Sequence, residues 1–251
     1  MQASYAEQYS GYEENHWWFR ARRVILRRLL AREIDWRPGL RVLEIGVGPG
    51  LNLYSLYPAG CELRGMEPDA GNAAIAGKRG PVPVSVGTLE ALPPELQAAT
   101  FDVITMFDVL EHIEDDAAAL GIVRARLAPG GVLVLSVPAY QWMWGQQDVV
   151  NLHFRRYSRG RLLALLQAAG FQVRRATYFN TLLFPPIAAI RLLARCFSSS
   201  RRPPKSDFEY STGGLSELLF RIFAAEAGWL ERRSFPFGVS LFAVARSDAQ
   251  S

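Results

Sequence analysis

Short apolar runs recur along the chain, separated by segments with helical spacing or by turn residues. The first five runs are dense in Val, Ile and Leu and show no regular polar alternation, which is typical of strands buried on both faces of a mostly parallel sheet. We expect seven strands, at 41–45, 62–66, 82–86, 101–107, 131–137, 171–178 and 240–246. Such a sheet needs helices on both of its faces.

Helical spacing and end signals predict the helices between these strands. Asp69 and Ser158 are expected to cap helix N-termini, Gly170 is expected to end a helix, and 129–131 reads as a turn. The expected helices cover 19–33, a short stretch after Gly50, 70–78, 115–127, 161–169 and 215–229. The alternation of strand and helix predicts an α/β fold with one open sheet.

Residues 179–236 break this rhythm. They contain an apolar run at 181–197, a polar stretch that includes an expected mobile loop at 198–207, and another helical segment before the last strand. We therefore expect a single domain over 1–251 with four parts. These are an N-terminal helical lid at 1–37, a ligand-binding core at 38–178, a helical insertion at 179–236, and the final strand and tail at 237–251.

Composition narrows the possible partners and the compartment. The net charge is +4 with 28 basic and 24 acidic residues, which does not fit a uniformly basic nucleic-acid binder. Cys61 and Cys196 lie far apart, so neither a disulfide framework nor a zinc cluster is expected. The polar N-terminus shows no signal-peptide pattern, so we expect a cytoplasmic protein. From the charge balance and the cysteine positions we expect no nucleic-acid partner and no metal centre.

The segment 41–50 carries the strongest chemical signal, because a strand runs into three alternate glycines, Gly46, Gly48 and Gly50. Glycine lacks Cβ, so the backbone can turn tightly and approach a ligand closely. A dinucleotide loop of the G-x-G-x-x-G type needs glycine where this chain has Leu51, which disfavours a pyrophosphate site. The alternative is a purely structural turn between strand and helix.

Glu44 precedes the first glycine by two residues and completes the pattern E-x-G-x-G-x-G. This pattern resembles the first motif of class I S-adenosylmethionine-dependent methyltransferases, in which the loop wraps the methionine part of the cofactor. Four later segments, at 65–69, 87–93, 107–113 and 127–135, resemble further motifs of the family in the same order. The resemblance implies a Rossmann-like seven-stranded sheet with an antiparallel last strand, and S-adenosylmethionine as the cofactor.

The same resemblance implies the remaining cofactor contacts. Glu67, at the end of the second strand, is the expected partner of the ribose hydroxyls, with a solvated loop carboxylate as the alternative. Thr88 stands where the family commonly has an aspartate facing the adenine amino group, so that contact is also open to Glu90, backbone or water. The other expected cofactor neighbours are Pro68, Leu89, Phe107, Asp108 and Val109.

Three side chains are candidates for work on the methyl acceptor: His112, His153 and Tyr157. A histidine titrates near neutral pH and can deprotonate a hydroxyl, although structural roles are the alternative for all three. The segment 13–23 resembles a recurring opening of one methyltransferase group. Its aromatic residues are expected to cover the cofactor, and Arg20 to meet the cofactor carboxylate, unless the segment only packs on the sheet.

The expected activity is methyl transfer to a small-molecule or lipid-linked acceptor, with oxygen as the expected target. A nicotinamide-dependent oxidoreductase and a non-catalytic cofactor-binding module are the alternatives. The run 181–197 is too short and too charged to cross a membrane, but its arginines and leucines suit a peripheral contact with anionic lipid. Packing on the sheet, or a contact between protomers, is the alternative for this run. The sequence leaves the oligomeric state open.

Overall fold

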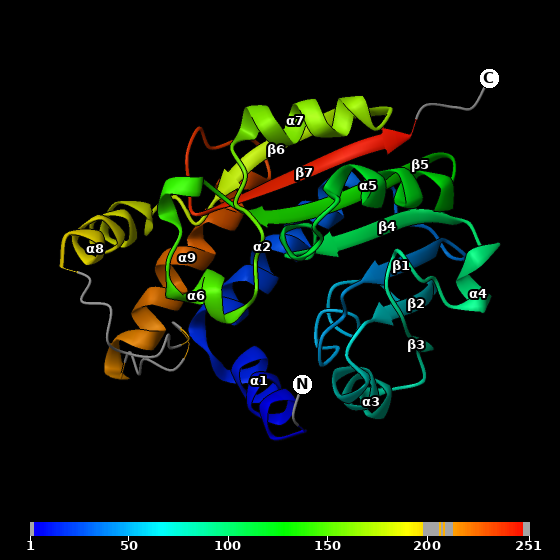
Figure 1. Ribbon diagram of the computed structural model, residues 1–251, viewed down its shortest axis with the longest axis horizontal. Helices are drawn as coiled ribbons and strands as arrows, with labels where there is room; N and C mark the ends of the chain where they lie inside the picture. The colour runs from blue at the N-terminus through cyan, green and yellow to red at the C-terminus, as the bar shows by residue number, and fades with distance from the viewer. Residues whose placement is uncertain (1–2, 198–205, 207, 209–212, 248–251) are drawn as a thin grey trace.

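Seven strands form one sheet in the computed structural model, which describes residues 3–197, 206, 208 and 213–247 (Figure 1). Their order is β3-β2-β1-β4-β5-β7-β6, and only β7 runs antiparallel to its neighbours. The expected Rossmann-like fold is confirmed. The strands are β1 (Arg41–Ile45), β2 (Glu62–Glu67), β3 (Val84–Val86), β4 (Phe101–Phe107), β5 (Leu127–Pro138), β6 (Phe171–Phe179) and β7 (Ser240–Ser247).

Helices cover both faces of the sheet. One face is covered by α2 (Trp17–Glu33) and α9 (Ser216–Leu230), and the other by α5 (Asp116–Arg126) and α7 (Arg159–Ala168). The remaining helices are α1 (Ala3–Asn15), α3 (Ala70–Arg79), α4 (Pro94–Gln97), α6 (Gln146–Val150) and α8 (Phe184–Phe197), with 3-10 turns η1 (Leu110–His112), η2 (Gln141–Met143) and η4 (Gly213–Leu215). No helix within the described ranges is long and apolar enough to cross a membrane.

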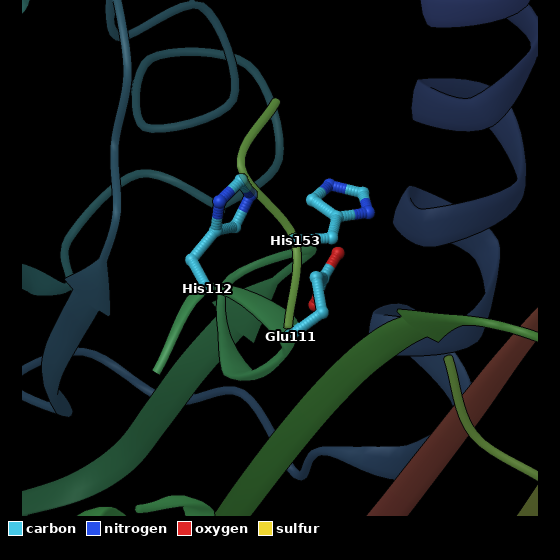
Figure 2. A group of neighbouring side chains, drawn as sticks. All are labelled: Glu111, His112 and His153. Carbon is cyan, nitrogen blue, oxygen red and sulfur yellow. The ribbon is translucent and has the colours of Figure 1, made fainter. Parts of the chain in front are cut away.

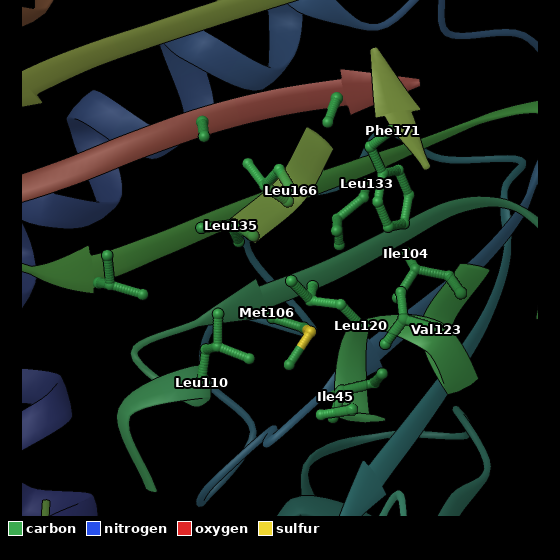
Figure 3. Close-up of a cluster of buried hydrophobic side chains, with 14 of the residues drawn as sticks. Ile45, Ile104, Met106, Leu110, Leu120, Val123, Leu133, Leu135, Leu166 and Phe171 are labelled. Atoms are coloured by element: carbon green, nitrogen blue, oxygen red, sulfur yellow. The ribbon is translucent and has the colours of Figure 1, made fainter. Parts of the chain in front are cut away.

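Side chains alternate between the two faces along each strand and build two cores. Ile104 and Leu133 pack with α5 and α7 in the cluster drawn in Figure 3, while Val103 and Val134 pack with α2 and α9. The central strands are therefore apolar on both faces, which explains why their sequences lack polar alternation. This rigid sheet fixes the positions of the loops at its carboxyl edge.

Backbone strain concentrates at that carboxyl edge. Three residues near the strand ends have a backbone φ of 58° to 60°. Asp108 directly follows β4, Asn180 directly follows β6, and Tyr140 lies two residues after β5. Such angles are unfavourable for residues with a Cβ and cluster at functional sites in proteins. The strain therefore indicates a functional site at the carboxyl edge of the sheet, near the ends of β4, β5 and β6.

All seven expected strands and the main expected helices are confirmed, with two corrections. The stretch after Gly50 forms successive turns rather than a helix, since its backbone hydrogen bonds are irregular. The expected turn at 129–131 lies inside β5, where the register against β4 shifts between Phe101 and Val103. The caps at Asp69 and Ser158 are confirmed by their hydrogen bonds to backbone N–H groups. The expected loop at 198–207 lies outside the described residues, except Ser206.

Candidate active site

The loop after β1 places its three glycines in the left-handed backbone region, with φ values of 72°, 55° and 90° at Gly46, Gly48 and Gly50. A Cβ at Gly46 would overlap the side chain of Val109, and one at Gly50 would stand 2.7 Å from the Cβ of Ala76. These two glycines permit close packing. A Cβ at Gly48 would meet only a carboxylate oxygen of Glu13, at 3.6 Å, so this position faces open space.

Glu67 connects the end of β2 to the glycine loop. Its Oε2 accepts a hydrogen bond from the N–H of Gly48 at 2.9 Å, and its Oε1 accepts from the N–H of Asp69 at 3.2 Å. Asn72 donates a third hydrogen bond at 3.3 Å. Burial raises the pKa of Glu67, while these hydrogen bonds oppose the rise. The carboxylate is thus held in a fixed position beside the loop, with acceptor capacity left for a ligand.

A cavity of about 340 Å³ lies at the carboxyl edge of the sheet, within the range of small-molecule sites. Its wall includes the glycine loop, the segment after β4, and the start of α2 with its aromatic residues. The aromatic residues are His16, Trp17, Trp18 and Phe19. The wall thus combines apolar surface with a few polar groups, as expected of a site for an organic ligand.

Helix α1 closes one side of this cavity through Glu13. The Glu13 carboxylate is buried and accepts a hydrogen bond from the N–H of Leu51 at 3.4 Å. Arg79 binds the helix from the other side, donating to Ser10 at 2.8 Å and pairing with Glu14 at 2.7 Å. Burial raises the pKa of Glu13 to about 7, against the opposing effects of the Leu51 N–H and nearby arginines.

We expect Glu13 to make the stability of the protein depend on pH. Because the folded pKa lies above the ordinary value of 4.5, the folded state holds the proton more tightly, and stability falls as the pH rises from 4.5 through 7. The loss is at most about 3 kcal/mol. In a Glu13→Gln variant this loss should disappear. Chemical denaturation of both proteins at pH 5 and pH 8 checks this, and equal pH dependence in the two would contradict it.

The segment after β4 carries a buried ion pair. Arg22 of α2 is 4% exposed and lies 2.7 Å from Oδ2 of Asp108, while Oδ1 of Asp108 accepts from the hydroxyl of Ser136 at 3.0 Å. Arg22 also donates to Ser136 at 3.1 Å. Breaking such a pair leaves a buried charge and is costly. The contact therefore ties α2 to the strained residue at the end of β4.

Two histidines and a glutamate meet next to this ion pair. Figure 2 shows Glu111 and His112, which belong to η1, beside His153 from the loop after α6. The ring centroids of His112 and His153 are 4.5 Å apart, with the rings nearly perpendicular. Desolvation and the neighbouring His153 lower the pKa of His112, while Asp108 opposes this effect. All three side chains line the cavity.

Asp148 of α6 orients His153. Its Oδ1 lies 2.9 Å from Nδ1 of His153 and 2.7 Å from Nε of Arg156. Although burial favours the neutral acid, the hydrogen bond with His153 and the charge of Arg156 lower the pKa of Asp148 to about 2. An ionised Asp148 accepts the Nδ1 proton, so Nε2 of a neutral His153 carries the lone pair.

These features agree with comparisons to known proteins. A family model described as a methyltransferase domain matches residues 16–176, well over half of the chain. The chain belongs to this family. A methyltransferase domain with S-adenosylmethionine as its cofactor is therefore confirmed, and the alternative of a nicotinamide-dependent oxidoreductase is not supported.

Individual relatives cover parts of this methyltransferase. A probable S-adenosylmethionine-dependent methyltransferase of Mycolicibacterium smegmatis is 32% identical over 65% of this chain and 62% of its own length. A ubiquinone biosynthesis O-methyltransferase of Bradyrhizobium is 32% identical over 45% of each chain. The chain thus spans about half to three fifths of these relatives. The crystal structure of an S-adenosylmethionine-dependent methyltransferase from Mesorhizobium loti shares the fold, with 18% identity, a TM-score of 0.57 and coverage of 87% and 95% of the two chains.

The structure of this methyltransferase divides the residues expected from sequence into two groups. Six line the cavity together: Gly46, Gly48, Phe107, Asp108, His112 and His153. A second group does not line the cavity: Glu44, Gly50, Glu67, Pro68, Thr88, Leu89 and Val109. Glu44 is buried below the loop, where it accepts a hydrogen bond from Tyr57 at 2.8 Å, and burial raises its pKa to about 8. The hydroxyl of Thr88 accepts from the N–H of Ala91 at 3.2 Å.

Arg20 and Tyr157 lie elsewhere, which corrects their expected places. The guanidinium of Arg20 pairs with Glu217 of α9 at 3.6 Å and lies over the ring of Phe220. The hydroxyl of Tyr157 is fully buried and donates to Asp116 at 2.9 Å. Helical geometry explains the first difference, because residues two apart face different sides of α2, and Arg22 instead of Arg20 reaches the cavity.

Sequence reasoning missed Glu13, Arg22 and Glu111 as cavity residues. Arg22 stands one helical step from the expected Arg20, and Glu111 directly precedes the expected His112. Their position within recognised segments was the available signal. Glu13 begins the recognised segment 13–23, but its place in the cavity depends on how α1 folds back over the glycine loop.

Proposed function

We propose that this methyltransferase transfers a methyl group to an oxygen atom of a small or lipid-linked acceptor. The observation that carries the proposal is a single cavity that joins Gly48 to His112 and His153. One wall suits the cofactor, and the other presents imidazole nitrogens to an acceptor hydroxyl. A base at this place matters for a hydroxyl acceptor because the neutral oxygen is a weak nucleophile.

The residues around the glycine loop fit S-adenosylmethionine. The open face of Gly48 admits the methionine part, and the carboxylate of Glu67 stands at the end of β2, where ribose hydroxyls can donate to it. Thr88 and Leu89 follow the next strand and would border the adenine. The bound cofactor supplies a methyl carbon on a positively charged sulfur, which is attacked in line.

The contribution of the protein is mainly alignment and exclusion of water, which can account for roughly 7–11 kcal/mol of a barrier. The aromatic side chains Trp17, Trp18 and Phe19 cover the cavity together with Glu13. We propose that this N-terminal segment is a lid over the cofactor. Arg22, by pairing with Asp108, would keep the lid in register with the end of β4.

A methylation screen tests the proposed function. The intact protein is incubated with radiolabelled S-adenosylmethionine and matched acceptors that carry hydroxyl, amino or no nucleophilic groups on the same ring or chain. Transfer to a hydroxylated acceptor supports the proposal. Transfer only to amines, with hydroxylated acceptors inert, would contradict oxygen as the target. The related ubiquinone biosynthesis O-methyltransferase makes polyprenylated phenols the first acceptors to include.

Helix α8 supports a lipid-linked acceptor. Its residues Ile187 and Arg191 line the cavity, while Ile190 and Leu193 are 65% and 57% exposed. The helix therefore joins the cavity to an exposed apolar surface, and its own sequence contains two arginines, Arg191 and Arg195. Leucines that enter the acyl boundary and arginines among anionic headgroups are the pattern of an interfacial helix. We propose peripheral contact of this helix with anionic membranes.

We expect the protein to sediment with anionic vesicles at low salt and to remain in solution with neutral ones. An Ile190→Glu, Leu193→Glu double variant should lose this binding, because it places charges in the acyl boundary. Val24→Glu, on the half-exposed face of α2, is the control for added negative charge. The absence of native protein from the anionic vesicle pellet would reject the membrane contact.

A further inference from the structure

Glu111, His112 and His153 form a cluster of possible metal ligands, a property that the proposed histidine base does not require. Each residue offers one possible ligand atom, and these atoms all lie within 4.8 Å of one another. Ligand atoms around one bound transition-metal ion stand about 3–4 Å apart, since each metal–ligand distance is about 2.1 Å. Small side-chain rotations therefore suffice to bring the three atoms around one ion.

We propose that Glu111, His112 and His153 bind a divalent transition-metal ion on the acceptor side of the cavity. Two imidazole nitrogens and one carboxylate oxygen are the ligand set of zinc sites and of other open transition-metal sites, whereas Mg²⁺ and Ca²⁺ prefer oxygen alone. All three residues line the cavity. Coordination positions facing the cavity are thus left for an acceptor.

The surroundings of Glu111 give a second reason to expect a cation at this place. It is fully buried, and neither of its carboxylate oxygens has a hydrogen-bond partner among the described residues. A buried carboxylate without partners is strongly unfavourable. Asp108 and Asp148, the neighbouring carboxylates, pair with Arg22 and Arg156 respectively. A bound cation would supply the partner that Glu111 lacks.

Neighbouring groups hold the side chains of the cluster in position, as is usual around metal ligands. Metal-binding histidines usually donate their second nitrogen to a carboxylate, which fixes the ring and raises its basicity. His153 has this arrangement with Asp148, which Arg156 holds in turn. The N–H of Phe154, next to His153, donates to the carbonyl of Glu111 at 2.8 Å. The two segments that carry the three ligands are therefore fixed to each other.

The role of such an ion rests on the proposed transfer to oxygen. A divalent cation beside the acceptor lowers the pKa of its hydroxyl and orients the oxygen. With the ion bound, His112 and His153 act as its ligands in place of a base, so the hydroxyl proton passes to water. The oxygen forms a bond to the methyl carbon, and the carbon–sulfur bond breaks with its electron pair going to sulfur. The products are the methyl ether, S-adenosylhomocysteine and a proton, so no further reactant is needed.

The first experiment measures metal binding without turnover. The intact protein is stripped with EDTA and titrated with Co²⁺, whose visible absorption reports its ligands, and then with Zn²⁺ as a competitor. We expect one ion per chain, displaced by Zn²⁺. Glu111→Gln, His112→Ala and His153→Ala should each weaken Co²⁺ binding by about 100-fold or more, because even outer partners of metal ligands matter 10–100-fold.

His16 provides the matched control, because it also lines the cavity but lies outside the cluster. His16→Asn retains a capping side chain for α2 and should bind Co²⁺ as the native protein does. Binding of S-adenosylhomocysteine is measured on every variant. It shows that the variants are folded and tests the cofactor site separately from the metal.

The outcomes distinguish the two proposals. Native protein that binds S-adenosylhomocysteine but binds Co²⁺ no better than the Glu111→Gln variant overturns the metal site and leaves the proposed methyl transfer standing. Transfer to hydroxylated acceptors that is unchanged by EDTA would likewise overturn the role of the ion. Metal binding with transfer only to amines would retain the site and reject the oxygen acceptor.

Discussion

Replacing Gly48 with valine is expected to weaken the binding of S-adenosylmethionine by at least about 100-fold while the protein remains folded. A Cβ at Gly48 would meet no atom closer than the Glu13 carboxylate at 3.6 Å, so the protein itself has room for it. The added branches would occupy the space needed by the methionine part of the cofactor. The φ of 55° also disfavours a β-branched residue, at a cost of about 1–3 kcal/mol.

Gly39→Val separates backbone strain from lost binding. Gly39 has a φ of 82°, and no atom lies within 4 Å of an added Cβ, so the substitution strains the backbone away from the glycine loop. Isothermal calorimetry with S-adenosylhomocysteine, together with thermal unfolding, compares the two variants. Undiminished affinity in folded Gly48→Val protein would show that the loop does not approach the cofactor. Gly46 is a poorer position for this test, because a side chain there would displace Val109.

Local patterns were sufficient to predict the strands and most of the helices, and the family resemblance supplied the antiparallel last strand. Strand β4 (Phe101–Phe107) was predicted to the residue, since a Val- and Ile-rich run between turn signals has few other structures open to it. The glycine loop was predicted for a similar reason, because three alternate glycines after a strand relate directly to left-handed backbone angles. These features depend on neighbours in sequence.

Long-range features were harder to predict. Whether Arg20 or Arg22 reaches the cavity depends on the rotation of α2 against the sheet, which is set by packing with α9. Tyr157 follows the expected motif, yet its hydroxyl is committed to Asp116, 41 residues away. The place of Glu13 depends on a helix that folds back over the loop. Such contacts join segments distant in sequence, and a single sequence does not specify their geometry.

The proposed metal site, which was not expected from the sequence, depends on the same kind of long-range contact. Only the three histidines, His16, His112 and His153, were available as nitrogen ligands, and none lies at a spacing typical of a metal motif. The loop after α6 brings the ring of His153 into contact with the ring of His112. The carboxylate of Glu111, buried and without a hydrogen-bond partner in the part of the chain that the structure describes, is apparent only in three dimensions. The proposed site is thus a product of topology.

Replacing Glu67 with alanine is expected to remove the recognition of the ribose. In the native protein, a charged acceptor for a ribose hydroxyl contributes about 1.5–3 kcal/mol, so 2′-deoxy-S-adenosylhomocysteine should bind roughly 10–150-fold more weakly than S-adenosylhomocysteine. Glu67→Ala should also weaken binding for a second reason, because Glu67 accepts the hydrogen bond from the N–H of Gly48 and so supports the loop. A single affinity would not separate these two effects.

The ratio of the two affinities does separate them. Loosening of the loop weakens both ligands equally, whereas loss of the ribose contact affects only the ligand that carries the 2′-hydroxyl. We therefore expect the preference for S-adenosylhomocysteine over its 2′-deoxy analogue to fall close to one in Glu67→Ala. Glu95→Gln, an exposed carboxylate outside the cavity, should keep the native ratio. If Glu67→Ala also keeps it, the carboxylate acts only through its bond to Gly48, and the ribose is recognised by another group.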